Sequence, residues 1–184
     1  MVRALMSATL TSLALVAAPT RSLAQAGADW TAAAAVDGYF LAIRTGDWRA
    51  AARVVAPEAL DTVKERYWRA AHDDERLRLP GLTAALASPE AWRALDPVDV
   101  FVTLLVALDA AAPELTAGID DARIVELRSR DDGWAEVRVD VSQRNGRSTL
   151  TRRVTVMVRR DESGWRVLPP HDLPKRVADA QRAR

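Results

Sequence analysis

The chain has 184 residues, with 26 basic and 25 acidic side chains and no cysteine. The lack of cysteine excludes disulfide bonds and a lipidated cysteine anchor. A net charge of only +1 excludes a general electrostatic attraction to nucleic acid.

The first 26 residues have the pattern of a secretory signal peptide. Arg3 precedes an apolar run over residues 4–18, Pro19 ends that run, and Ala24-Gln25-Ala26 supplies the small residues that a signal peptidase recognises. The run is shorter than the roughly 20 apolar residues of a membrane-spanning helix. We therefore expect removal of residues 1–26 and a periplasmic or secreted protein with no stable membrane anchor after cleavage. Its net charge is then about −1, because 24 basic and 25 acidic residues remain.

The next segment, up to about residue 112, predicts a series of helices. Apolar residues recur at helical spacing from Val36 to Ile43, which predicts that Phe40 and Ile43 are buried against the sheet. Gly46-Asp47 separates this helix from the next. The charged stretch 72–81 reads as a loop or a frayed helix end. A proline in the first turn, with or without a polar cap, predicts the further helix starts, and the helix from Pro97 is apolar enough to be buried on nearly all sides. These starts are Pro57, Ser88-Pro89 and Asp96-Pro97.

The remainder changes to the two-residue period of strands. Two runs alternate, and Asn145-Gly146 between them is a hairpin signal. Asp161–Gly164 predicts a further turn before a last strand that ends at Pro169-Pro170. The fold class is α+β: N-terminal helices packed on a curved antiparallel sheet of about four strands, in one domain over residues 27–174 with a mobile C-terminal tail over 175–184. The apolar residues that share one face are Ala135, Val137, Val139 and Val141 in one run and Leu150, Val154, Val156 and Val158 in the other.

Two short stretches carry a resemblance to a known family. One is Val36-x-x-Tyr39-x-x-Ala42-x-x-x-Gly46-Asp47, followed by Ala52 and Ala56-Pro57; the other is the closing segment DESGWRVL, residues 161–168. With the order of elements, they resemble the NTF2-like superfamily, which includes ketosteroid isomerases and SnoaL-type cyclases. The resemblance implies a cone-shaped fold with a cavity on the concave side of the sheet, and pairing of two copies through their sheets.

The resemblance also allows the catalytic positions of ketosteroid isomerases to be compared with the residues of this chain. Ketosteroid isomerases combine a tyrosine and a protonated acid, which hold an oxyanion, with a carboxylate that moves the proton. Their tyrosine falls on Tyr39, but their base falls near Val63 and their second acid near Val156. We therefore expect no catalytic residue and no cofactor, and interpret Tyr39 as a core tyrosine. The alternative is an isomerase- or cyclase-type enzyme in which Tyr39 works with a carboxylate such as Asp37 or Asp140.

Tryptophans are the other informative residues, because the chain has six and is otherwise poor in aromatics. A cavity walled by valine, leucine and tryptophan would suit an apolar small molecule. The expected ligand-binding residues are Tyr39, Trp48, Trp134 and Trp165. The expected function is an exported, non-catalytic domain that binds a small apolar ligand or a protein partner; a structural assembly module is a further alternative.

Two charged groups are given ordinary structural interpretations. His72-Asp73-Asp74-Glu75 contains metal-ligand residue types, but adjacent residues of a helix point apart, and His171 lies far away in the sequence. No metal site is expected. The arginines of the predicted sheet, from Arg138 to Arg160, are interpreted as a solvated outer face that discourages edge pairing.

Overall fold

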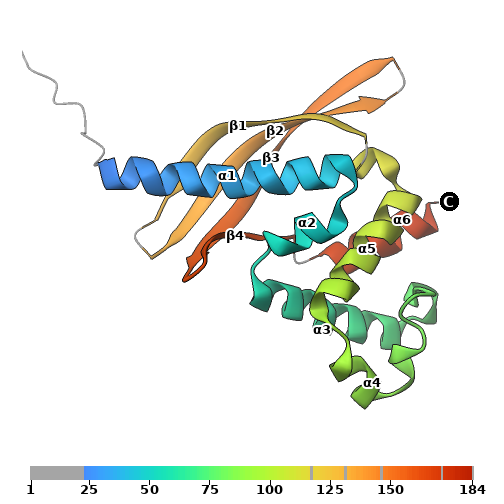
Figure 1. Ribbon diagram of the computed structural model, residues 1–184. Helices are drawn as coiled ribbons and strands as arrows, with labels where there is room; N and C mark the ends of the chain where they lie inside the picture. The colour runs from blue at the N-terminus through green and yellow to red at the C-terminus, as the bar shows by residue number, and fades with distance from the viewer. Residues whose placement is uncertain (1–22, 117, 131, 146, 171, 184) are drawn as a thin grey trace, which may run out of the picture.

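Helices form the first part of the structure and an antiparallel sheet the second (Figure 1). The computed structural model describes residues 23–116, 118–130, 132–145, 147–170 and 172–183. The elements are α1 (Leu23–Thr45), α2 (Trp48–Arg53), α3 (Pro57–Asp73), the 3₁₀ turns η1 (Glu75–Leu77) and η2 (Ala85–Ala87), α4 (Pro89–Ala94), α5 (Pro97–Ala111), η3 (Pro113–Leu115), β1 (Ile119–Ser129), β2 (Trp134–Asn145), β3 (Ser148–Asp161), β4 (Gly164–Leu168) and α6 (Leu173–Arg182).

Gly46 separates α1 from α2. Its φ of +69° lies in the left-handed region, which glycine adopts without a steric penalty. The carboxylate of Asp47 then accepts a 2.9 Å hydrogen bond from the N–H of Ala50 and caps α2. The predicted break and the predicted cap are both confirmed.

Local signals also place the starts of α3, α4 and α5. Pro57 occupies the first turn of α3, where its missing N–H removes no helical hydrogen bond. Ser88 Oγ accepts from the N–H of Ala91 at 3.0 Å, and Asp96 Oδ1 accepts from the N–H of Val98 at 2.8 Å. The three predicted starts are confirmed.

Helix α5 is less completely buried than predicted. Val100 and Phe101 are fully buried among α2, α3 and α6, but Val106 is 47% exposed. Asp99 accepts a 2.7 Å hydrogen bond from Arg49 of α2. The prediction of burial on nearly all sides is therefore wrong for the face that carries Val106, because the neighbouring helices leave that face uncovered.

The sheet has the order β1-β2-β3-β4, with every neighbouring pair antiparallel. Helix α1 runs across one face of the sheet, and the other helices gather beyond one end of it (Figure 1). The predicted α+β class, helices followed by a curved four-stranded sheet, is confirmed.

One face of the sheet is the floor of the hydrophobic core. Ala135, Val137 and Val139 of β2 are fully buried, as the alternation predicted, and Val158 of β3 is buried beside Ala135. Leu150 belongs to the same face by register but is 62% exposed. The predicted face is therefore confirmed, and Leu150 is exposed because it lies near the hairpin end of β3.

The β2–β3 connection falls where the Asn-Gly signal predicted it. Asn145 pairs with Ser148 in the register, whereas Gly146 lies outside the described residues.

A short contact between distant segments ties β4 to the helices. The N–H of Ala56 donates to the carbonyl oxygen of Val167 at 3.0 Å, and the N–H of Val167 donates to that of Val54 at 2.8 Å. Val55 and Val167 are both almost fully buried there. This parallel bridge fixes the last strand against the start of α3.

The C-terminal segment corrects a prediction. Residues 175–184 were expected to be a mobile tail, but Leu173–Arg182 forms α6, which packs on α5 and α3. Leu173, Val177 and Ala178 are buried there. Their spacing gives this polar segment one apolar face, which the composition alone concealed.

Most of the expected signal peptide, residues 1–22, lies outside the described residues. The expected cleavage site, residues 24–26, falls in the first turn of α1. Among the described residues, no helix combines the length and apolarity that crossing a membrane requires.

Candidate functional site

A cleft of about 860 Å³ lies between the helices and β3. Its volume falls within the usual range of small-molecule sites. Residues of α1, α3, α5, β2, β3 and α6 line it, as does the segment that joins β4 to α6. Most of the lining is apolar: Phe40, Ile43, Val63, Leu105, Leu108, Val154 and Val156.

The cleft follows from a mismatch in strand length. β4 has five residues and pairs only with Met157–Asp161 of the much longer β3. Pro169-Pro170 then ends the strand, since proline has no N–H for a ladder, and the chain turns into α6. Within the described residues, the rest of β3 has no strand on this side, and its edge borders the cleft.

Tyr39 lies in the cleft, half-buried on α1. Its hydroxyl forms no hydrogen bond with the residues that the structure describes. Burial raises the pKa of Tyr39 to about 12, although the nearby Arg176 guanidinium acts in the opposite direction. The phenol is therefore neutral at physiological pH and free to donate a hydrogen bond into the cleft.

The neighbouring Phe40 shares this wall. Its ring meets that of Tyr39 edge-on, with 5.8 Å between the centroids. Ile43 is 5% exposed, as predicted. Phe40 packs against the hydrophobic core but is only half-buried, because part of its ring lines the cleft. Its predicted burial is therefore only partly confirmed.

The structure brings together two of the four residues predicted to bind a ligand. Tyr39 and Trp134 line the cleft, whereas Trp48 and Trp165 do not. Trp48 and Trp165 are half-buried against the hydrophobic core instead. The Trp134 ring lies 5.8 Å from the guanidinium carbon of Arg159, which also lines the cleft.

Both carboxylates that line the cleft are already engaged by arginines. Glu58 forms an ion pair with Arg159, and Asp172 pairs with Arg176 one turn later on α6, at 3.0 Å. Because of these ion pairs, neither Glu58 nor Asp172 is free to act as a base. This geometry does not favour proton transfer by a carboxylate in the cleft.

The two carboxylates proposed as partners of Tyr39 lie elsewhere. Asp37 borders a separate depression with Arg44 and Asp121, and burial raises its pKa. Asp140 lies on the opposite face of the sheet. Val63 and Val156, where the family resemblance places acids, both line the cleft as hydrocarbon.

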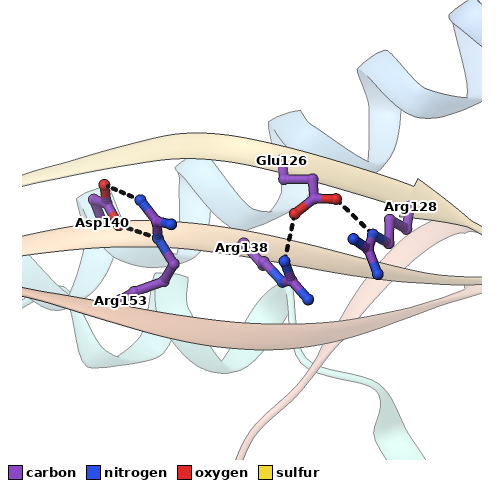
Figure 2. Close-up of polar contacts among 5 residues, drawn as sticks. All are labelled: Glu126, Arg128, Arg138, Asp140 and Arg153. Carbon is purple, nitrogen blue, oxygen red and sulfur yellow. Dashed lines mark hydrogen bonds and ion pairs between the residues drawn. The ribbon is translucent and has the colours of Figure 1, made fainter.

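The outer face of the sheet carries a row of ion pairs (Figure 2). Arg153 donates to both oxygens of Asp140, at 2.7 and 2.9 Å, and Arg138 donates to Glu126 at 2.6 Å. Hydrogen bonds from the arginines lower the pKa of Asp140 and of Glu126. Much of the positive charge on this face is therefore balanced locally, as the interpretation of a solvated face expects.

The acidic segment after α3 is held by structural contacts. His72 Nδ1 lies 2.9 Å from the carbonyl oxygen of Trp68, and Asp74 pairs with Arg76. In the described part of the chain, no three potential metal ligands come together. His171 lies outside the described residues.

Sequence reasoning missed three arginines of the cleft, Arg152, Arg159 and Arg176. Arg152 and Arg159 were assigned to the solvated outer face, and for these two that interpretation is wrong because both line the cleft. Arg152 interrupts the apolar alternation of β3 between Leu150 and Val154, and this interruption was an available signal. Arg176 was assigned to the expected tail, so its electrostatic influence on Tyr39 was not anticipated.

Comparison with family models, with curated proteins and with solved structures finds no match to this chain.

Proposed function

We propose that this chain is a non-catalytic, NTF2-like binding domain that holds a small apolar molecule in the cleft beside β3. The observation that carries the proposal is an apolar cleft of about 860 Å³ with a half-buried phenol that has no partner among the described residues. Apolar walls with a few convergent polar groups are typical of small-molecule sites.

The lack of catalysis follows from the same lining. Isomerase- or cyclase-type proton transfer needs a free carboxylate that acts as the base. Among the described residues, the acids of the cleft, Glu58 and Asp172, are paired with arginines, and valines stand where the resemblance places acids. Within this part of the chain, the cleft therefore offers donors such as Tyr39 but no unpaired carboxylate as a base.

The experiment is a titration of the purified protein with the neutral apolar dye N-phenyl-1-naphthylamine, followed by fluorescence. We expect saturable binding. Val156→Lys should weaken it at least tenfold by placing a charge in the cleft, whereas Val125→Lys should not, because Val125 is exposed on β1 away from the cleft.

A second pair of variants guards against loss of folding. Thr62→Trp fills the cleft from an exposed position on α3, and the neighbouring Asp61→Trp leaves it open. Absence of saturable binding, or equal binding by both members of each pair, would overturn the proposal.

We further propose that the protein is exported and that its mature chain begins at or near Gly27. The motive is the apolar run that ends at Ala24-Gln25-Ala26. Amino-terminal sequencing of the protein recovered from the periplasm or medium tests this. Recovery of a soluble cytoplasmic protein that begins at Met1 would contradict it.

A further inference from the structure

The cleft has more positive than negative charge in its lining. Among the described residues, three arginines line it, Arg152, Arg159 and Arg176, against the two carboxylates Glu58 and Asp172. Because Arg159 and Arg176 form the ion pairs with these acids, the remaining positive charge belongs to Arg152.

Arg152 occupies an unusual place for a cation. It lies opposite Val141 in the register, so it belongs to the face of the sheet that carries the core valines. Its side chain is exposed at the cleft and, within the described residues, forms no ion pair or hydrogen bond. Its five donors are therefore open to an acceptor that enters the cleft.

The adjacent Arg153 shows the contrast. It points to the outer face and holds Asp140 through two hydrogen bonds (Figure 2). The two arginines therefore have the same charge and the same strand but opposite surroundings: one is neutralised on a solvated face, and the other borders an apolar cleft.

The Tyr39 hydroxyl is a second hydrogen-bond donor of the cleft that, like Arg152, has no partner among the described residues. The Tyr39 hydroxyl is a neutral donor, and Arg176 lies near enough to influence it electrostatically. A phenol and a guanidinium both donate hydrogen bonds and neither supplies a negative charge, so the groups left without partners select an acceptor that carries one.

We propose that the ligand of the cleft is an amphipathic anion: a hydrocarbon body that lies against the apolar lining, and a single acidic group that Arg152 binds. This inference rests on the proposed function and specifies its ligand class. The apolar part would contact Ile43, Leu105 and Val154, and the acidic group would lie at the β3 edge.

The test compares three ten-carbon probes by calorimetry on the purified protein: decanoate, decanol and decylamine, each below its micelle concentration. We expect decanoate to bind at least tenfold more tightly than decanol, and decylamine to bind most weakly. Arg152→Leu should remove the preference for decanoate and leave decanol binding unchanged, because a charged hydrogen bond is lost.

Arg153→Leu is the matched control, since it removes the same charge from the adjacent residue of the outer face. It should keep the preference for decanoate. Arg152→Glu should reverse the preference toward decylamine; because Arg152 is exposed, we expect both of its variants to fold, and circular dichroism checks this.

The outcomes separate the two proposals. Equal binding of decanoate and decanol that Arg152→Leu does not change would overturn the anionic ligand while leaving apolar binding intact. Equal weakening by the Arg152 and Arg153 variants would also overturn it, by showing a general charge effect. Failure of all three probes to bind, with no dye binding, would overturn the proposed function itself.

Discussion

The backbone N–H of Leu79 donates a 2.8 Å hydrogen bond to the hydroxyl oxygen of Tyr67, and this hydroxyl donates in turn to the carbonyl oxygen of Leu77 at 3.0 Å. The two bonds attach the segment after η1 to α3. Tyr67 is 2% exposed. The chain's other tyrosine, Tyr39, makes no such bond within the described residues, so the two phenols have different roles.

Tyr67→Phe should therefore destabilise the protein by about 1–3 kcal/mol, because the buried N–H of Leu79 is left without an acceptor. Tyr39→Phe should change the free energy of unfolding by less than about 0.5 kcal/mol. Urea denaturation of both variants measures the difference. Equal losses would show that the Tyr39 hydroxyl has a structural partner.

Alkaline titration should show that both tyrosines resist ionisation. Burial raises the pKa of Tyr67 and raises that of Tyr39 to about 12. The stability that this gives is present in full below the unfolded value, about pH 10, and is lost as the pH rises toward the folded values. Tyrosinate absorbance should therefore be small at pH 10 in the folded protein and about half-maximal in urea. Similar absorbance in both states would contradict the burial of the phenols.

The chain's two phenylalanines should respond differently to truncation. Phe101 of α5 is fully buried, and Phe101→Ala should destabilise the protein by about 3–5 kcal/mol. Phe40→Ala should have a clearly smaller effect, because one side of its ring already faces the cleft. Denaturant titration compares them, and a larger loss at Phe40 would place that residue in the core instead.

A pair of substitutions on α6 tests whether the C-terminal helix is part of the core. Val177→Asp should destabilise by about 3 kcal/mol or more, because it buries a carboxylate without a partner. Lys175→Asp, at an exposed position of the same helix, should stay within about 0.5 kcal/mol. Thermal unfolding measures both. If neither variant changed the melting temperature, the segment would be the mobile tail that its composition suggested.

Local signals explain which parts of the fold could be predicted. Asp47, Ser88 and Asp96 cap helices with their own side chains, and the valines of β2 alternate with the period of a strand. Such features depend on a few neighbouring residues. The α+β class was therefore readable from the sequence.

The candidate site was harder to predict because it depends on where elements end relative to one another. Trp134 begins β2 and Trp165 lies near the start of β4, yet of the two only Trp134 lines the cleft. The role of Arg152 depends on which face of β3 it occupies and on what packs there. These contacts join segments that are far apart in the chain, so they cannot be predicted from the type and spacing of neighbouring residues.

The cleft can be completed only late in folding. It depends on the bridge between Val55 and Val167 and on the position of α6. One wall of the cleft comes from α1 and another from residues 169–176, so the two walls are separated by most of the chain. Contacts of such long sequence separation form late in folding. A chain that is still emerging from a ribosome thus has no complete cleft, and the ligand binding that we propose must wait until α6 has been released.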